Sequence, residues 1–309
     1  MPSNLLNVVC LMGPTATGKT QLAIELTRLA PFEIISVDSA MVYRGMDIGT
    51  AKPSQAELAN IPHHLIDICD PAESYSVGRF VEDASHLIDK ILATQKIPLL
   101  VGGTMLYFHT LEQGMAKLPS ADKKIRHEID QEAHLTSWAE LHKKLHLIDP
   151  QSAARIKSSD RQRIQRALEV YYLTDKTLTQ WHQEQTTPAL PYQMIHFSLL
   201  PPQRALLHRR IAERFEKMLK RGFVEEVKSL YARSDLSLHL PSIRTVGYRQ
   251  MWEYLEGNYS FEEMKEKAII ATRQLAKRQI TWLNQWKDLH CLSSEDRDNS
   301  TIILKKLNL

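Results

Sequence analysis

The sequence predicts an α/β fold, in which a parallel sheet is flanked by helices and a helical insertion interrupts the chain. Three observations support this prediction. Residues 1–119 alternate short apolar runs with longer amphipathic segments, residues 120–193 are dominated by helical periodicity, and a further strand-like run follows. Strands that alternate with helices form crossover units, so the sheet is expected to be parallel and covered on both faces. A chain of 309 residues is long enough for this arrangement.

The strands are expected at the short apolar runs, which span residues 6–12, 34–37, 65–68, 99–101 and 194–200. Residues 19–30 and 77–94 are expected to form helices between them. Apolar residues at three- and four-residue spacings, beginning with Ile125 and Ile129, predict the helices of the insertion. Residues 186–192 contain two prolines and predict a loop. We therefore predict a core of residues 1–119 and 194–290 that ends in helices, and an insertion of residues 120–193. Residues 292–309 are left unassigned.

Residues 13–20, GPTATGKT, match the phosphate-loop pattern G-x-x-x-x-G-K-[ST] between a strand and a helix. The glycines let the backbone curl around an anion, and the helix N-terminus adds a positive dipole end. Lys19 supplies a mobile cation, and the Thr20 hydroxyl is suited to a phosphate-bound Mg²⁺. The residues expected to hold a diphosphate are Gly13, Pro14, Thr15, Ala16, Thr17, Gly18, Lys19 and Thr20. The loop predicts a P-loop NTPase-like core, for which a kinase or an ATPase is the default function.

Two polar residues follow other predicted strands. Asp38 comes after residues 34–37, and Thr104 follows the glycines at 102 and 103. The carboxyl ends of parallel strands form the edge at which ligands bind, so Asp38 is expected to face the phosphate loop. Asp38 could position Mg²⁺ or a water in a triphosphatase, or accept a proton from a nucleophile in a transferase. A helix cap or a plain turn is the alternative for each residue.

Longer stretches of the sequence resemble one family. The phosphate loop, DSAMVYRGMDIGTAKP at residues 38–53 and GGTMLY at 102–107 are followed by DRQRIQRALE at 160–169, RTVGYRQ at 244–250 and ATRQLAKRQ at 271–279. Together and in this order they resemble the tRNA dimethylallyltransferases, in the shorter bacterial form. The resemblance implies transfer of a dimethylallyl group from dimethylallyl diphosphate to N6 of adenosine 37, next to the tRNA anticodon. It further implies Mg²⁺ dependence and catalytic roles for Lys19, Thr20, Thr104 and Asp38, the last as the base.

An adenine in an anticodon loop must be extruded to reach a closed pocket, so the RNA needs contacts on both sides of the base. Ser159 and Gln162 are expected to form a capping box at the helix that carries several basic and amide side chains. Met41 stands where the family often has Gln, so this position lacks the amide that could hydrogen-bond to the adenine. The residues expected to contact tRNA are Asp38, Ser39, Ala40, Met41, Thr104, Arg126, Gln162, Arg163, Ile164, Gln165, Arg166, Ile243, Arg244, Thr245, Val246, Gly247 and Tyr248.

The charges of the chain are unevenly distributed. Residues 1–119 contain 8 Lys and Arg against 12 Asp and Glu, and the remainder contains 31 against 24. The basic remainder suggests a polyanionic partner, although solvated helix faces would give the same balance. Arg210 and Arg214 are four residues apart on a predicted helix, so one face of that helix could add cations to the diphosphate.

The composition also bears on the cellular location of the protein. No apolar run is long enough to cross a bilayer, and the three cysteines show no disulfide or zinc-site spacing. We expect a cytoplasmic protein without a membrane partner, and the family favours a monomer. A P-loop kinase for small molecules or nucleotides, and a nucleic-acid-binding ATPase, are the alternative functions.

Overall fold

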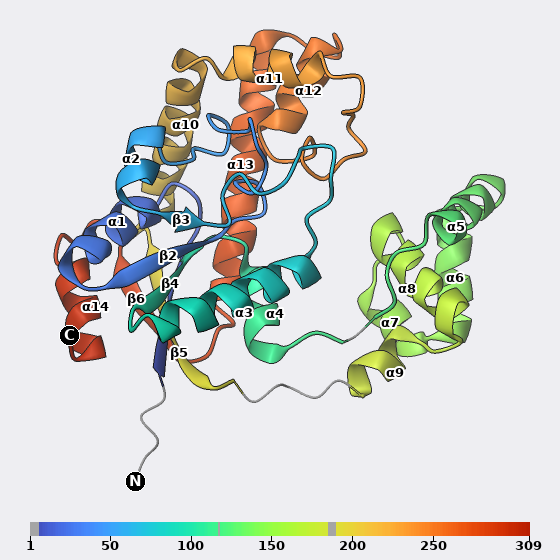
Figure 1. Ribbon diagram of the computed structural model, residues 1–309. Helices are drawn as coiled ribbons and strands as arrows, with labels where there is room; N and C mark the ends of the chain where they lie inside the picture. Colours follow the sequence, from blue (N-terminus) through green and yellow to red (C-terminus); the bar gives the residue numbers. More distant parts are fainter. Residues whose placement is uncertain (1–5, 117, 185–189) are drawn as a thin grey trace. The chain divides into compact units, whose positions relative to one another are not determined.

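A computed structural model of the protein describes residues 6–116, 118–184 and 190–309. Within these residues the strands form one sheet in the order β3-β2-β4-β1-β5-β6, and every neighbouring pair is parallel (Figure 1). The strands are β1 (Leu6–Met12), β2 (Phe32–Val37), β3 (His63–His64), β4 (Ile97–Gly102), β5 (Tyr192–Leu200) and β6 (Leu289–Ser293). The predicted fold class, a parallel sheet flanked by helices, is confirmed.

The central strand β1 is apolar on both faces, because helices cover the sheet on both sides. Val8, Cys10 and Met12 face a large core, whereas Val9 and Leu11 face a smaller one. The helices of the larger core are α3 (Val77–Ala93), α4 (Met105–Gln113), α10 (Arg204–Lys220), α11 (Phe223–Tyr231), α12 (Tyr248–Leu255) and α13 (Phe261–Leu283). The helices α1 (Lys19–Leu29) and α14 (Asn299–Leu307) pack on the smaller core, and α2 (Gln55–Asn60) precedes β3. Burial of apolar residues on both faces is typical of parallel sheets.

The contacts divide the chain into two units, one of Met1–Glu112 with Leu190–Leu309 and one of Gln113–Ala189. The second unit holds α5 (Lys123–Leu135), α6 (Trp138–Ile148), α7 (Pro150–Arg155), α8 (Arg161–Thr174) and α9 (Leu178–Gln183) around its own small core. The insertion predicted at residues 120–193 overlaps this unit. Tyr192 and Gln193 belong to β5, because they pair with Leu6 and Asn7 of β1.

The sequence prediction was wrong at residues 65–68. This segment is not a strand, because Leu65 and Asp67 have left-handed backbone conformations with φ of 63° and 57°. The residues that pair with β2 are His63 and His64, immediately before this segment. Asp67 turns inward, where its carboxylate accepts a hydrogen bond from the buried ammonium of Lys52. The same ammonium also donates to the Tyr43 carbonyl and to the Asp47 carboxylate, so the buried charge has three acceptors.

Two elements near the C-terminus were not predicted. Leu289–Ser293 form β6, and Asn299–Leu307 form α14, whose Ile303 and Leu307 are buried against the smaller core. The polar residues between these apolar positions obscured both elements. The loop predicted at residues 186–192 lies mostly outside the described residues. None of the helices in the described ranges is long and apolar enough to span a membrane.

Candidate active site

Three loops meet at the carboxyl edge of the sheet. The phosphate loop follows β1, Asp38 follows β2, and Gly103 and Thr104 follow β4. Because β4 lies between β1 and β2, Thr104 is placed between the phosphate loop and Asp38. Two cavities of about 500 and 340 Å³ open here, and residues from all three loops line both of them. The residues common to both cavities are Thr15, Asp38, Gly103, Arg214 and Gln279.

The phosphate loop is held in its curled form by hydrogen bonds to one carbonyl. The Thr17 hydroxyl and the Lys19 ammonium both donate to the Pro14 carbonyl, at 2.9 and 2.7 Å. Gly13 is packed so closely that a Cβ there would lie 2.6 Å from the Leu199 carbonyl oxygen. Gly18 has φ of 90°, a conformation that favours glycine. Thr15, Ala16, Thr17, Gly18, Lys19 and Thr20 line the smaller cavity, while Gly13 and Pro14 are buried.

Lys19 lies among other charged groups. Burial, together with the nearby positive charge of Arg214, lowers the pKa of its ammonium to about 7, and the negative charge of Asp38 opposes part of this change. Burial also lowers the pKa of Arg214, again opposed by Asp38. Two cations therefore share this site with one carboxylate, and an anionic ligand would relieve their repulsion.

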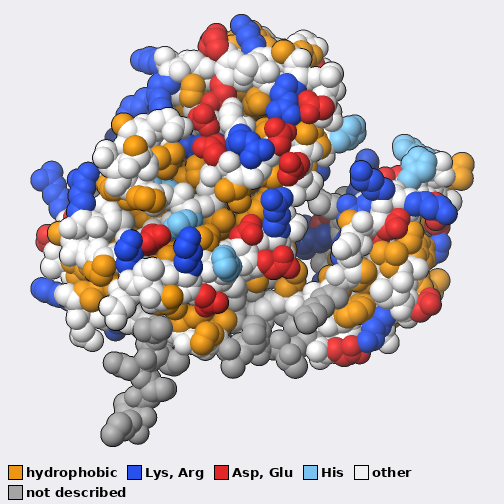
Figure 2. Space-filling model, viewed as in Figure 1, with side chains coloured by type: hydrophobic (Ala, Val, Ile, Leu, Met, Phe, Trp, Pro, Cys, Tyr) orange, Lys and Arg blue, Asp and Glu red, His pale blue; other side chains and the backbone are white. Residues whose placement is uncertain are grey.

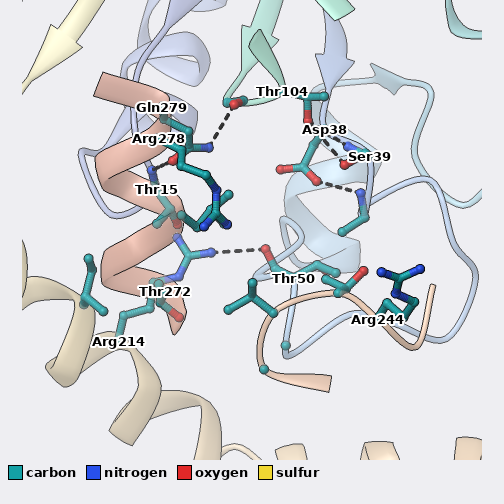
Figure 3. A pocket seen from close by; sticks show the side chains of 18 of the residues that line it. Thr15, Asp38, Ser39, Thr50, Thr104, Arg214, Arg244, Thr272, Arg278 and Gln279 are labelled. Atoms are coloured by element: carbon teal, nitrogen blue, oxygen red, sulfur yellow. Dashed lines mark hydrogen bonds between the residues drawn. The ribbon is translucent and has the colours of Figure 1, made fainter. Parts of the chain in front are cut away.

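Asp38 stabilises the turn that follows β2, which is the alternative that the sequence offered for this residue. One carboxylate oxygen, Oδ1, accepts hydrogen bonds from the backbone N–H groups of Ala40 and Met41, at 2.8 and 3.3 Å. This contact fixes the turn after β2 and orients the carboxylate. In Figure 3, Asp38 and Arg214 point into the same cavity from different sides. Among the described residues, the second oxygen of Asp38 makes no hydrogen bond.

Thr104 connects its own turn to the turn of Asp38. Its Oγ1 accepts a hydrogen bond from the Ser39 backbone N–H at 3.1 Å, and its hydroxyl donates to Ser39 Oγ at 3.4 Å. Ser39 and Ala40 line the larger cavity, whereas Met41 lines the smaller one. Thr104 is thus tied to the residue that follows Asp38.

The structure separates the two arginines of α10 that the sequence grouped together. Arg214 lines both cavities and donates to the Thr50 carbonyl at 3.2 Å. Arg210 instead donates to Ser294 Oγ at 2.9 Å and to the Glu295 carboxylate at 2.7 Å. The residues after β6, which the sequence left unassigned, therefore hold Arg210 outside both cavities. Of these two arginines, only Arg214 lines the cavities beside the phosphate loop.

Gln279 was not predicted as a site residue, although it ends one of the recognised motifs. Its Oε1 accepts a hydrogen bond from the Thr15 backbone N–H at 3.0 Å, and its Nε2 donates to the Gly103 carbonyl at 2.8 Å. A Cβ on Gly103 would lie 2.4 Å from that Nε2. Gln279 of α13 thus ties the phosphate loop to the turn that carries Thr104 (Figure 3). A lone glutamine within a basic helix gave no separate signal.

The segment 243–248 contributes differently from residue to residue. Arg244, Thr245, Val246 and Gly247 line the larger cavity. Ile243 and Tyr248 are fully buried, and the Tyr248 hydroxyl donates to Glu226 at 2.5 Å. The side chains of these last two residues are therefore part of the core rather than of a surface for RNA.

The predicted RNA-binding residues of the second unit are also divided. Arg126 and Arg166 both donate to Glu169, whose side chain is fully buried, and Gln165 donates to Asp130 at 2.7 Å. The hydrophobic core of this unit includes Ile164. Gln162 and Arg163 are exposed at the start of α8. The capping box predicted at Ser159 was wrong, because Asp160 caps α8 by accepting from the Arg163 N–H at 3.2 Å.

Within the described ranges, no group of three or more His, Cys, Asp or Glu side chains could hold a metal ion. Figure 2 shows Lys and Arg side chains interspersed with Asp and Glu on the visible face.

Comparisons with known proteins show which family the chain resembles. The family model described as IPP transferase matches residues 41–286, and the isopentenyl transferase model matches residues 6–70. A tRNA dimethylallyltransferase of Coxiella burnetii is 58% identical over 291 residues, which cover 94% of this chain and 94% of the relative. The solved tRNA isopentenylpyrophosphate transferase of Bacillus halodurans is 36% identical with a TM-score of 0.71, covering 98% of this chain and 97% of that chain. A eukaryotic dimethylallyltransferase, solved acting on tRNA, is 28% identical with a TM-score of 0.84, covering 98% and 79%.

Proposed function

The chain belongs to the tRNA dimethylallyltransferase family and is a tRNA prenyltransferase, and from this premise we propose how its residues carry out the reaction. The substrates are dimethylallyl diphosphate and a tRNA whose adenosine 37 lies next to the anticodon. The product is N6-(dimethylallyl)adenosine, released with diphosphate. The observation that carries the proposal is the convergence of the phosphate loop, Asp38 and Thr104 on one pair of cavities.

The diphosphate binds on the phosphate loop, between Lys19 and Arg214. Backbone N–H groups and the N-terminus of α1 give directional contacts, and the two cations neutralise the charge that develops on the leaving oxygen. Mg²⁺ binds with the diphosphate, because a threonine hydroxyl and phosphate oxygens are the hard ligands that this ion prefers. Thr20, which lines the smaller cavity, would provide the hydroxyl. When bound, the ion would withdraw electron density from the leaving group.

The transfer step needs a base and good alignment. The N6 lone pair of the adenine forms a bond to C1 of the allylic group, while the C1–O bond breaks and its electron pair leaves with the diphosphate. The proton from N6 passes to Asp38, whose second oxygen is free to accept it while Oδ1 stays bound to the turn. Thr104 and Ser39 hold this turn in place beside the leaving group.

The tRNA approaches through the larger cavity. Arg244 and Arg278 line it, and Leu106 and Trp282 are exposed apolar residues that also line it. Cations for phosphates and flat or apolar surfaces for an unstacked base are what extrusion of an adenine requires. Gln162 and Arg163 of α8 are proposed as further contacts to the RNA. We also propose that the protein works in the cytoplasm, where its substrate is found, and its monomeric state stays a prediction.

A paired assay tests this function. The purified protein is incubated with Mg²⁺ and unmodified tRNA, with dimethylallyl diphosphate in one tube and ATP in the other. Mass spectrometry of the digested tRNA should detect N6-(dimethylallyl)adenosine only with the prenyl donor. Consumption of ATP without a modified adenosine would instead support a kinase or an ATPase.

A further inference from the structure

Glu226 of α11 is a carboxylate that holds a loop far away in sequence. Its Oε2 accepts hydrogen bonds from the backbone N–H groups of Asp47 and Ile48, at 2.9 and 2.6 Å. Its Oε1 accepts from the Gly49 N–H at 3.1 Å and from the Tyr248 hydroxyl at 2.5 Å. Bonds of this kind to an ionised carboxylate are stronger than neutral ones. The contact therefore defines where the loop lies.

The loop that Glu226 holds, residues 47–49, is followed by a residue that contacts Arg214. Thr50 follows Gly49, and its carbonyl accepts the hydrogen bond from Arg214 at 3.2 Å. Gly49 and Thr50 both line the larger cavity. Arg214 also lies close enough to Lys19 to lower the pKa of that ammonium. The Thr50 carbonyl thus gives the Arg214 guanidinium an acceptor that fixes it close to this second cation.

The other partner of Glu226 adjoins a second wall of the same cavity, formed by residues 244–247. Tyr248 begins α12, directly after the cavity-lining residues 244–247. Its ring packs edge-on against Phe223, with the ring centroids 5.1 Å apart. Gly49 fits against both rings, since a Cβ there would lie 2.3 Å from Phe223 and 2.6 Å from Tyr248. One carboxylate thus joins the wall of residues 47–50, which contacts Arg214, to the wall of residues 244–247.

We propose that Glu226 is a positioning residue for the transfer, which keeps Arg214 directed at the diphosphate and keeps both walls of the cavity at a fixed distance. This inference builds on the proposed function, but its first step concerns diphosphate binding alone. Glu226 acts through the backbone of residues 47–50 and touches no substrate. Glutamine at this position would have only one oxygen to accept with, so part of the loop would lose its partner.

The test compares Glu226→Gln with Glu225→Gln, which changes the charge of an exposed neighbour on the same helix. Calorimetry measures the affinity for inorganic pyrophosphate with Mg²⁺, and steady-state assays give kcat and KM for each substrate. We expect Glu226→Gln to weaken pyrophosphate binding about tenfold and to lower kcat, as befits lost hydrogen bonds to a charged group. Glu225→Gln should behave as the wild type.

A double-mutant cycle separates positioning from general stability. Combining Glu226→Gln with Arg214→Ala should weaken pyrophosphate binding no more than Arg214→Ala alone, because both changes remove the same interaction. Additive losses, or a lowered melting temperature with unchanged pyrophosphate affinity, would overturn the proposal. If Glu226→Gln does not fold, Tyr248→Phe takes its place. It removes one hydrogen bond from Glu226 and should raise the KM for tRNA, and an unchanged KM would count against the link between the walls.

The outcome is independent of the proposed reaction. Failure of the wild-type protein to modify tRNA would refute the transferase function, whereas the pyrophosphate measurements would still report on Glu226 and Arg214.

Discussion

Lys19, Arg214 and Asp38 are unbalanced in charge until a ligand binds. The lowered pKa of Lys19, about 7, reports the cost of placing an ammonium in a buried position close to a guanidinium. A diphosphate would supply the missing negative charge and would return Lys19 to its protonated form. The repulsion between the two cations would thus favour binding of an anion at the phosphate loop.

This cluster predicts a pH dependence of substrate binding. Below pH 7 Lys19 is already protonated in the free protein. Above pH 7 the diphosphate must bring a proton with it, so its affinity should fall by up to about tenfold per pH unit. Calorimetric titration of dimethylallyl diphosphate between about pH 6 and pH 9 measures this, with Lys19→Arg as the control, because arginine stays charged over the whole range. Identical pH profiles for the two proteins would contradict the assignment.

Asp38→Asn tests the proposed base without disturbing the turn. The amide oxygen of asparagine accepts the same hydrogen bonds from Ala40 and Met41, so the melting temperature should be unchanged. Loss of the proton acceptor should lower kcat by about two to four orders of magnitude. Diphosphate affinity serves as the control and should not weaken. A kcat close to that of the wild type would exclude Asp38 as the base.

At the scale of elements, α8 combines a structural half with an exposed half. Glu169 near its middle is buried and gathers Arg126, Arg166 and the Asp122 backbone N–H. These contacts lower the pKa of Glu169 despite its burial. The first turn of the helix is exposed, which leaves Gln162 and Arg163 available to a partner.

The division of α8 predicts different effects for two arginines. Arg163→Ala should weaken tRNA binding and leave the stability unchanged. It should also reduce the slope of the logarithm of the binding constant against the logarithm of salt concentration by about one. Arg166→Ala should destabilise the helical unit by about 2 kcal/mol, since it removes charged hydrogen bonds to a buried carboxylate. Filter binding at several salt concentrations and thermal unfolding measure the two effects. Equal effects of both variants on RNA affinity, without a change in stability, would contradict this division.

The start of α8 gives a further test of the corrected cap. Asp160→Ala should destabilise the helix by about 1 kcal/mol, because the N–H of Arg163 loses its acceptor. Ser159→Ala, one residue earlier, should have almost no effect. Hydrogen exchange of the first amides of α8 reports the difference. Faster exchange in Ser159→Ala than in Asp160→Ala would restore the original prediction.

At the scale of the whole molecule, charge is divided between the two parts of the chain. Residues 1–119 are acidic on balance and the remainder is basic, so the basic part is the one expected to attract tRNA. The KM for tRNA should therefore rise at least about tenfold between roughly 50 and 200 mM salt. The KM for dimethylallyl diphosphate, which binds in a cavity, should change much less. Steady-state kinetics at several salt concentrations provide the measurement, and equal shifts would indicate that salt acts on the protein itself.

The sequence by itself determined four of the six strands, β1, β2, β4 and β5, and the three loops that follow β1, β2 and β4. The phosphate loop, Asp38 and Thr104 could be predicted because each follows a buried strand, and parallel strands bring their carboxyl ends to one edge. The family motifs then identified the reaction. These signals are local in sequence, so they are readable without the tertiary structure.

Only the tertiary structure decided which side chains reach the site. Arg210 and Arg214 occupy equivalent positions on one helix, and contacts with Ser294 and Glu295 determine that only Arg214 lines the cavities. Gln279 and Glu226 act on loops more than 170 residues away in sequence. No local pattern records such pairs, because hydrogen bonds between distant segments depend on how the helices pack against the sheet.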